Sequence, residues 1–234
     1  AIYQAMVLGL RDYVNKAGFP GVLIGLSGGV DSALSAAVAV DALGPDRVHC
    51  VMMPSPFTSK ESLEDASEAA TLLGIRYDTV SIEPAMAAFD DMLSPIFANR
   101  KADVTEENIQ ARSRGLLLMS ISNKFGDMLL TTGNKSEMAV GYSTLYGDMS
   151  GGYSVLKDVY KTDVFRACHW RNDNFRDEFL GPKGRVIPER IITKPPSAEL
   201  KPDQTDQDTL PPYDDLDDIL GCLIEGEMGI DEIA

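Results

Sequence analysis

The strongest constraint on the fold is the alternation of short apolar runs with helix-forming segments through the first half of the sequence. Apolar residues recur at helical spacing over residues 1–17, which predicts an opening helix. Strands that alternate with helices form parallel sheets with helices on both faces. The sequence therefore predicts an α/β fold, a doubly wound, mostly parallel sheet, with strands at 21–26, 48–54, 77–83 and 127–133 and helices at 32–43, 58–74, 84–99 and 105–126.

Local signals predict where three of these helices begin or end. Gly44 and Pro45 form a common stop signal after the helix at 32–43. The Thr-Ser-Lys-Glu of residues 58–61 fits a capping box that begins at Thr58. Thr105, followed by two glutamates, is the expected N-cap of the long helix at 105–126.

Composition excludes several classes of protein. With 234 residues, 44% of them hydrophobic, the chain can bury one proper core. Its three cysteines are far apart and odd in number, which argues against a metal motif or a disulfide framework and fits a reducing cytoplasm. No apolar run reaches the roughly 20 residues that span a bilayer, and no signal peptide opens the chain. We therefore expect a cytoplasmic protein that is not bound to a membrane.

The net charge of −15 disfavours nucleic acid as a partner, because such binding needs cations that neutralise phosphates. Much of this charge lies after residue 197, where a solvated acidic surface is the expected role of most carboxylates. The chain begins with Ala1 and its helical periodicity starts at once, so we expect a piece of a longer polypeptide.

The turn Gly-Leu-Ser-Gly-Gly-Val-Asp-Ser at residues 25–32 joins the first predicted sheet strand to its helix. A helix N-terminus offers unpaired N–H groups and partial positive charge, so such a turn commonly faces a phosphate. The turn matches neither GxxxxGK[ST] nor GxGxxG. Without a P-loop lysine, Asp31 is placed to hold Mg²⁺ on the phosphates, and Ser27 and Ser32 can donate hydrogen bonds. The alternative is a serine-glycine turn without a ligand.

Three later segments extend this site. A second Gly-containing turn follows the strand at 127–133, and the two turns are expected to face one crevice beyond the carboxyl ends of the strands. Residues 141–152 are rich in glycine and tyrosine, which favours a ligand-facing loop. Residues 172–207 are charged and proline-punctuated, so they fit either a linker or a lid ordered by ligand.

Residues 208–234 are predicted to be an acidic helical segment.

The turn at residues 25–32 resembles the PP-loop of the N-type ATP pyrophosphatases, which split ATP between its α and β phosphates. The loop alone does not choose among members such as GMP synthetase, asparagine synthetase and tRNA-modifying enzymes. TEENIQARSRG, LLTTGNKSEMAVGYSTLYGDMSGG, KDVYK and KPPSAELKPDQTDQD choose among them. Together they resemble the synthetase domain of bacterial glutamine-dependent NAD synthetases over nearly all of the chain.

The resemblance implies a site and a role for each matching residue. Thr132 and Lys161 would contact ATP, and Ser197 would close over its phosphates; Asp31, Lys161 and Thr132 are the implied catalytic residues. Glu137 would join Asp31 in holding Mg²⁺ and would lie near the substrate, deamido-NAD. The loop residues implied on ATP are Gly25, Leu26, Ser27, Gly28, Gly29, Val30, Asp31 and Ser32, and those implied on deamido-NAD are Asn108, Arg112, Glu137, Tyr142, Ser143, Thr144 and Leu145.

Several of these side chains also fit a structural role. Arg112 and Arg114 fit surface cations paired with the glutamates at 106 and 107, Lys135 and Lys157 fit solvated lysines, and Tyr142 and Tyr146 fit a packed pair. His49 and His169 are expected to be structural rather than catalytic.

The resemblance implies that the nicotinate carboxylate of deamido-NAD is adenylated by ATP and then amidated by ammonia, giving NAD, AMP and pyrophosphate. Family members carry an amino-terminal glutaminase domain, which these residues lack, so the chain alone is expected to use free ammonia. The family's basic carboxyl-terminal segment either lies beyond Ala234 or is absent, which puts the activity of the piece in doubt. The family assembles through a dimer of synthetase domains. The rivals are another PP-loop ligase, GMP synthetase being the nearest, and a non-catalytic nucleotide-binding module.

Overall fold

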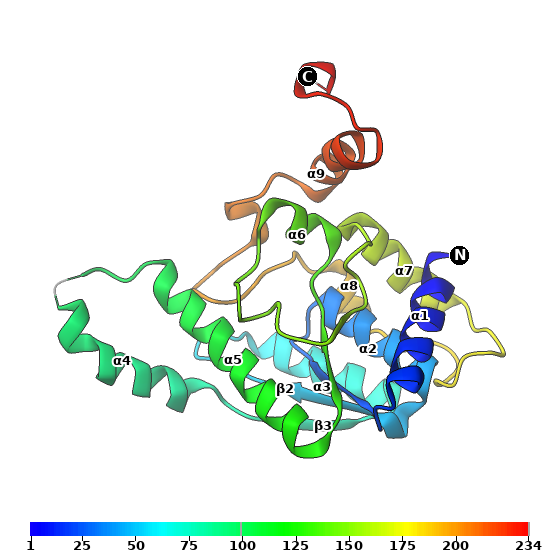
Figure 1. Cartoon of the computed structure of the whole chain (residues 1–234), viewed down its shortest axis with the longest axis horizontal. Coiled ribbons are helices and arrows are strands. Elements are labelled where there is room, and N and C mark those ends of the chain that lie inside the picture. The colour runs from blue at the N-terminus through cyan, green and yellow to red at the C-terminus, as the bar shows by residue number, and fades with distance from the viewer. Residues whose placement is uncertain (99, 234) are drawn as a thin grey trace.

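A five-stranded parallel sheet forms the centre of the chain in a computed structural model that describes residues 1–98 and 100–233 (Figure 1). Its strand order is β3-β2-β1-β4-β5, and each described strand pairing is parallel. The strands are β1 (Val22–Gly25), β2 (Val48–Met52), β3 (Arg76–Thr79), β4 (Met128–Thr131) and β5 (Tyr153–Ser154). The predicted α/β fold class is confirmed, and the strand order reverses between β1 and β4.

Helices cover the sheet on both faces. The helices of the described residues are α1 (Ile2–Ala17), α2 (Val30–Leu43), α3 (Lys60–Leu73), α4 (Glu83–Phe97), α5 (Val104–Phe125), α6 (Lys135–Val140), α7 (Lys161–Asp173), α8 (Glu189–Thr193), α9 (Tyr213–Leu220) and α10 (Ile230–Ile233). Short 3-10 turns lie at Pro45–Arg47 and Asp206–Asp208, and a π-helical turn lies at Gly221–Glu225.

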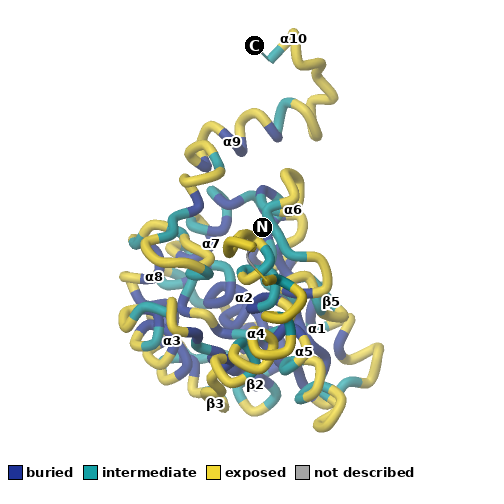
Figure 2. Tube along the Cα trace, turned by 90° about the vertical axis from the view of Figure 1, so that its left-hand side faces the viewer, coloured by how far each residue is buried: buried dark blue, intermediate teal, exposed yellow. Residues whose placement is uncertain are grey.

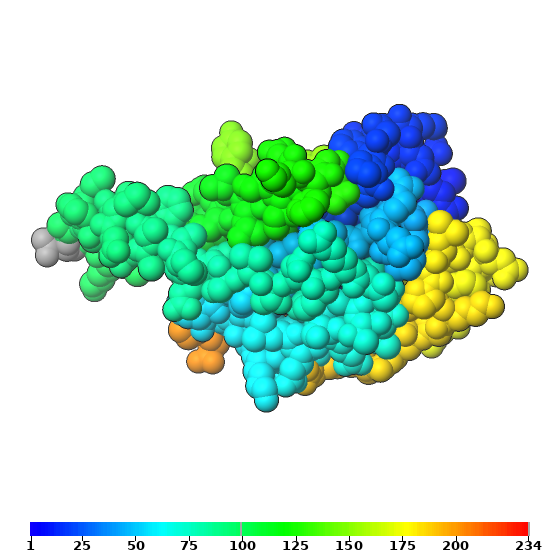
Figure 3. Space-filling model, turned by 90° about the horizontal axis from the view of Figure 1, so that it is seen from below, coloured from blue at the N-terminus to red at the C-terminus, as the bar shows by residue number. Residues whose placement is uncertain are grey.

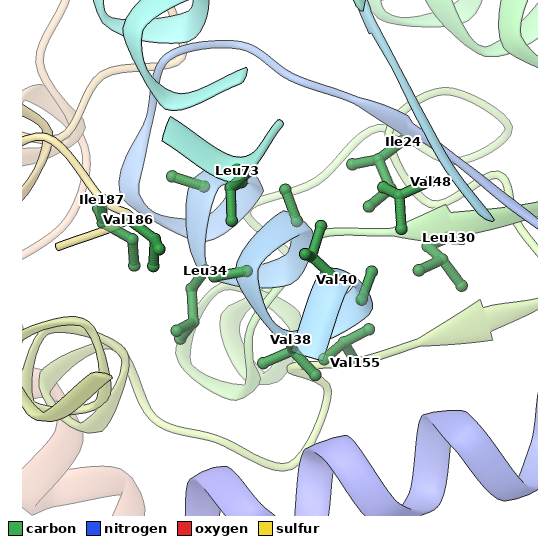
Figure 4. Close-up of a cluster of buried hydrophobic side chains, with 14 of the residues drawn as sticks. Ile24, Leu34, Val38, Val40, Val48, Leu73, Leu130, Val155, Val186 and Ile187 are labelled. Atoms are coloured by element: carbon green, nitrogen blue, oxygen red, sulfur yellow. The ribbon is translucent and has the colours of Figure 1, made fainter. Parts of the chain in front are cut away.

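Alternate strand residues enter two separate cores, as the two-residue repeat of a strand requires. Ile24 and Leu130 pack in a large core with α1, α2, α3 and α7. Leu23 and Leu129 pack on the other face, against apolar residues of α4 and α5. Figure 4 shows side chains of α2 among those of β1, β2 and β4. The helix α2 is therefore buried almost throughout, which explains why its sequence is rich in alanine and valine.

Two predicted helix starts are wrong. The N-cap of α3 is Ser59, whose hydroxyl accepts from the Ser62 amide, whereas Thr58 accepts from the amide of Ser55. The N-cap of α5 is Asp103, which forms a capping box with Glu106, so Thr105 lies inside the helix. In each case the cap lies within two residues of the predicted one, where several Ser, Thr and Asp side chains compete to accept from the first free amides.

All four predicted strands are shorter in the structure than predicted, and β3 is largely exposed at the edge of the sheet. Residue 99, the last of the helix predicted at 84–99, and residue 234, the last of the acidic segment, lie outside the described residues. Within the described ranges, the structure contains no helix that is both long and apolar enough to cross a membrane.

Two parts project from this body. The hairpin of α4 and α5 extends to one side (Figures 1 and 3), and none of the described residues of α4 is buried. The segment from α9 to α10 extends away from the sheet, and residues 223–232 within it are exposed (Figures 1 and 2).

Candidate active site

A cavity of about 330 Å³ lies beyond the carboxyl ends of the central strands. The PP-loop (residues 25–32) and the turn after β4 both line it, so the prediction that the two turns face one crevice is confirmed. Further walls come from the end of β2, the start of α3, the middle of α5 and residues 194–200. The site therefore lies where the strand order reverses, as in other open α/β sheets.

The PP-loop is braced by its own hydroxyls and by α3. Ser27 and Ser32 lie with their Oγ atoms 3.1 Å apart, and Ser32 donates to the Gly29 carbonyl at 3.0 Å. Gly28 has a φ of +80°, and a Cβ there would lie 2.3 Å from the backbone oxygen of Ser62. Only glycine fits both the left-handed backbone and this approach.

Three charged side chains from three helices meet beside the loop. The Lys161 ammonium lies 2.6 Å from Asp31 Oδ2 and 2.9 Å from Glu137 Oε1. Asn134, the N-cap of α6, donates its side-chain amide to Asp31 Oδ1 at 2.8 Å and accepts from the Glu137 amide. The lysine side chain is only 2% exposed, so the contact is shielded from water.

The electrostatics of this cluster favour a charged lysine. Burial alone would lower the pKa of Lys161, but Asp31 and Glu137 outweigh it and hold that pKa above its ordinary value. Burial and the nearby Asp31 carboxylate raise the pKa of Glu137 to about 7, although Lys161 opposes the shift. The cluster therefore carries two acidic groups against one cation.

The structure places the remaining expected nucleotide residues around the same cavity. Thr132 lies directly after β4 and lines it. Ser197 also lines it, and its hydroxyl donates to the Gln204 carbonyl at 2.5 Å, within its own segment.

The residues expected on deamido-NAD divide between the cavity and its rim. Tyr142, Thr144 and Glu137 line the cavity. Asn108 lies behind Thr144, whose hydroxyl donates to its Oδ1 at 2.9 Å, and Arg112 Nε donates to the Leu145 carbonyl at 3.2 Å. Ser143 and Leu145, like Asn108 and Arg112, are absent from the described lining of the cavity, and Leu145 is 58% exposed.

Arg114 is a cavity residue for which the sequence reasoning offered a surface cation as an alternative and which it left out of the expected site. Its Nε donates to the Met53 carbonyl at 3.0 Å at the end of β2. Burial lowers the pKa of Arg114 to about 10, although the Glu199 carboxylate opposes this. The surface alternative is wrong for Arg114, and its position two residues after Arg112 on α5 gave no signal of burial.

Glu199 is a second residue that the sequence reasoning did not single out. It lines the cavity, and its carboxylate accepts from the hydroxyls of Ser59 and Ser62 at the start of α3, at 2.8 and 2.7 Å.

The structure also tests the structural roles that were considered for Lys135, for Tyr142 with Tyr146, and for His49. Lys135 is not solvated, because it pairs with Glu225 at 2.5 Å. Tyr142 donates to Asp206 at 3.3 Å while Tyr146 is 77% exposed, so they do not act as a buried pair. His49 is buried and lies 2.8 Å from Asp78, a structural role as expected.

The linker alternative is wrong for part of residues 172–207. Val186, Ile187, Ile191 and Ile192 are buried in the main core. After them, Lys194 donates to Ser62 at 2.9 Å, which brings the segment to the wall of the cavity.

Comparisons with known proteins give relatives that match nearly the whole chain. The family model described as NAD synthase matches residues 2–234. The glutamine-dependent NAD(+) synthetase of Rhodobacter capsulatus is 60% identical over 232 residues, which cover 99% of this chain and 42% of that protein. The chain thus spans about two fifths of the length of the curated relatives it matches.

Solved structures give the same picture. The glutamine-dependent NAD+ synthetase of Acinetobacter baumannii in complex with ADP is 51% identical, with a TM-score of 0.78, over 99% of this chain and 40% of that one. The NMN synthetase of Francisella tularensis is 30% identical, with a TM-score of 0.81, over 94% of this chain and 84% of that one.

Proposed function

Because the chain belongs to the NAD synthase family, we propose that it forms the amide of NAD from deamido-NAD and ammonia at the expense of ATP. The observation that carries this proposal is the cluster of Asp31, Glu137 and Lys161 beside the PP-loop. The similarity to a relative solved with ADP supports an adenine nucleotide at this site.

A carboxylate is a poor electrophile, because its charge repels nucleophiles and oxide is a bad leaving group. In the proposed reaction a carboxylate oxygen attacks the α-phosphorus, and the bond from that phosphorus to pyrophosphate breaks. Ammonia then attacks the acyl carbon, the bond from that carbon to the AMP oxygen breaks, and the nitrogen loses a proton. The acyl group thus passes from the acyl-adenylate to ammonia as an amide, and AMP and pyrophosphate are released.

The chain's own groups suit the first step. The amides of the PP-loop and the N-terminus of α2 would bind the departing pyrophosphate. Lys161 would counter the charge that develops on the phosphates. Residues 141–152 and 185–207 are the proposed lids. They would keep water away from the mixed anhydride that the acyl group forms with AMP.

The donor set also suits Mg²⁺. Mg²⁺ prefers oxygen ligands and is usually held by one or two carboxylates together with substrate phosphates. Asp31 and Glu137 would hold the ion, and when bound it would neutralise charge on the phosphates.

The nitrogen source and the assembly are further proposals. The curated relatives are named glutamine-dependent and are longer, which supports a glutaminase domain in the complete protein that supplies ammonia. We also propose a homodimer, because α4 presents Phe89, Met92 and Ile96 on one exposed face. The cytoplasmic location stays a prediction from the cysteine pattern, and no nucleic-acid partner is proposed.

One relative favours a second acceptor. The Francisella tularensis structure is named an NMN synthetase, so the deamidated form of that mononucleotide is the alternative substrate to test. The comparisons do not favour GMP synthetase or a non-catalytic module.

The test is an assay of the purified chain with MgATP, ammonium and one acceptor at a time: deamido-NAD, nicotinate mononucleotide or xanthosine monophosphate. We expect amide product and equimolar AMP with deamido-NAD, and no product from the Asp31→Ala variant. Product from xanthosine monophosphate alone, or equal rates for the two proteins, would overturn the proposal.

A further inference from the structure

The helix α9 contacts two of the three helices that carry the charged cluster, α6 and α7 (Figure 1). Two of its side chains, Tyr213 and Asp217, are one helical turn apart and buried, whereas Asp214, Asp215 and Asp218 are exposed. The exposed carboxylates fit the solvated acidic surface that the composition indicates. Asp217 differs from them and needs another explanation, because a buried carboxylate is costly unless it is paired or hydrogen-bonded.

Asp217 binds the start of α7 both directly and through α6. Its Oδ2 accepts from the Thr162 amide at 2.8 Å, and its Oδ1 accepts from the hydroxyl of Ser136. That hydroxyl accepts in turn from the Lys161 amide at 2.8 Å. Asp217 therefore satisfies the Thr162 amide directly and the Lys161 amide only through Ser136, at the helix end where the partial positive charge of α7 also favours a carboxylate.

The residues that Asp217 holds are neighbours of the charged cluster. Ser136 immediately precedes Glu137, and Thr162 immediately follows Lys161. On the same face of α9, the Tyr213 ring lies with its centroid 5.1 Å from the Lys161 ammonium. Both ends of Lys161, its backbone amide and its ammonium, thus meet groups that α9 positions.

We propose that Asp217 is a positioning residue for the synthetase site, which fixes Lys161 and Glu137 relative to each other by tying α7 to α6. The proposal rests on the function proposed above, because it takes Lys161 as the group that meets the phosphates. It makes α9 part of the active site's support rather than a stretch of acidic surface.

The test is the Asp217→Asn variant of the same chain, with Asp218→Asn as the matched control on the exposed face of α9. Asparagine keeps the shape but loses one acceptor and the charge. We expect kcat to fall about 10- to 100-fold and the dissociation constant for MgATP to rise several-fold, because small misplacements of catalytic groups are costly. The control should match wild type in both measurements.

A double-mutant cycle with Lys161→Met distinguishes a positioning role of Asp217 from a role in stability alone. In this cycle Asp217→Asn is repeated in the Lys161→Met background. If Asp217 acts through Lys161, Asp217→Asn should change kcat and MgATP affinity there by less than about twofold. Losses of full size in that background would overturn the proposal. So would a lowered melting temperature with unchanged kcat and affinity per folded molecule.

Two further measurements keep the proposal decidable. If Asp217→Asn does not fold, Ser136→Ala breaks the same link to the Lys161 amide and takes its place in the cycle. If the wild-type chain makes no amide product, the proposed function fails, and the cycle is then read from MgATP binding by calorimetry. Equal MgATP affinity for wild type and the folded variant would contradict the positioning role.

Discussion

At the scale of single residues, the site depends on a buried cluster in which acidic groups outnumber cations. Glu137 and Asp31 share one lysine, and burial together with Asp31 raises the pKa of Glu137 to about 7. A carboxyl group with a raised pKa binds its proton more tightly in the folded chain than in the unfolded chain. The arrangement therefore costs stability whenever Glu137 is ionised, and a cation bound beside it would recover that cost.

This cost predicts a pH dependence of folding. Between the ordinary value of 4.5 and about 7, the folded state binds more protons than the unfolded state, so the free energy of unfolding should fall as the pH rises through this window. Glu137→Gln removes this contribution. Urea unfolding of the ligand-free chain at pH 5 and pH 7.5 should show a larger loss of stability for wild type than for the variant.

Asp148, which is present in both wild type and Glu137→Gln, is an internal control for the pH dependence of unfolding. Burial also raises its pKa, but it lies outside the charged cluster and accepts from the Thr144 amide at 2.7 Å. Equal pH dependence for wild type and Glu137→Gln would show that the buried cluster does not titrate in this window.

At the scale of elements, three helices behind the sheet are joined by one buried carboxylate. Asp41 of α2 accepts from Arg171 Nε of α7 at 2.5 Å and from the Tyr3 hydroxyl of α1 at 2.6 Å. The side chains of Asp41 and Arg171 are 0% exposed. The network fixes the position of α2 relative to α7, and these are the helices that carry Asp31 and Lys161.

Breaking one side of this pair should be costly. Arg171→Met leaves Asp41 buried without its cation, and we expect a loss of about 3–5 kcal/mol in the free energy of unfolding, measured by urea titration. Arg166→Met, which removes an exposed cation from the same helix, is the control and should cost less than about 1 kcal/mol. A similar small loss for both variants would contradict the structural role of the network.

How much of these elements could be predicted depends on whether the signal is local. The strands β1, β2 and β4 are mostly apolar, because both faces of a central parallel strand are buried, and the sequence located them. The strand β5 has only two residues, too few for any periodic signal. The first half of α5 buries Gln110, Ser113 and small residues rather than an apolar stripe, so the inner face there, and Arg114 with it, could not be recognised.

In the candidate site, too, the features with a local sequence signal were predicted and the long-range contacts were not. The PP-loop and the turn after β4 are short contiguous motifs, and strand polarity alone predicted that they meet. The ion pairs of Lys161 and the cap that Asp217 gives to α7 join residues 24 to 130 positions apart in the chain. Such contacts depend on how helices pack, which a single sequence does not display.

At the scale of the whole molecule, the projecting hairpin of α4 and α5 is the feature that the body of the fold leaves uncovered (Figure 3). Met92 is 61% and Ile96 75% exposed, and with Phe89 they lie one helical turn apart along α4. Apolar faces of this kind mark protein interaction sites, and a second copy of the chain is the occupant that we propose.

The homodimer predicts the effect of a charge on this face. Ile96→Asp should convert a dimer into a monomer, because an aspartate cannot be buried unpaired in an apolar interface. Sedimentation of wild type, Ile96→Asp and the exposed control Asp90→Ser measures this directly. A wild-type monomer, or a variant that still dimerises at the same concentration, would rule out α4 as the interface.

The claim that most of the account depends on is that the acceptor carboxylate is activated at the α-phosphorus of ATP. The direct measurement is to run the reaction with deamido-NAD labelled with ¹⁸O in both oxygens of its nicotinate carboxylate and to weigh the phosphorus products by mass spectrometry. The account predicts one ¹⁸O in each AMP formed and none in pyrophosphate, because the attacking oxygen leaves with AMP. Label in inorganic phosphate, or AMP without label, would contradict it.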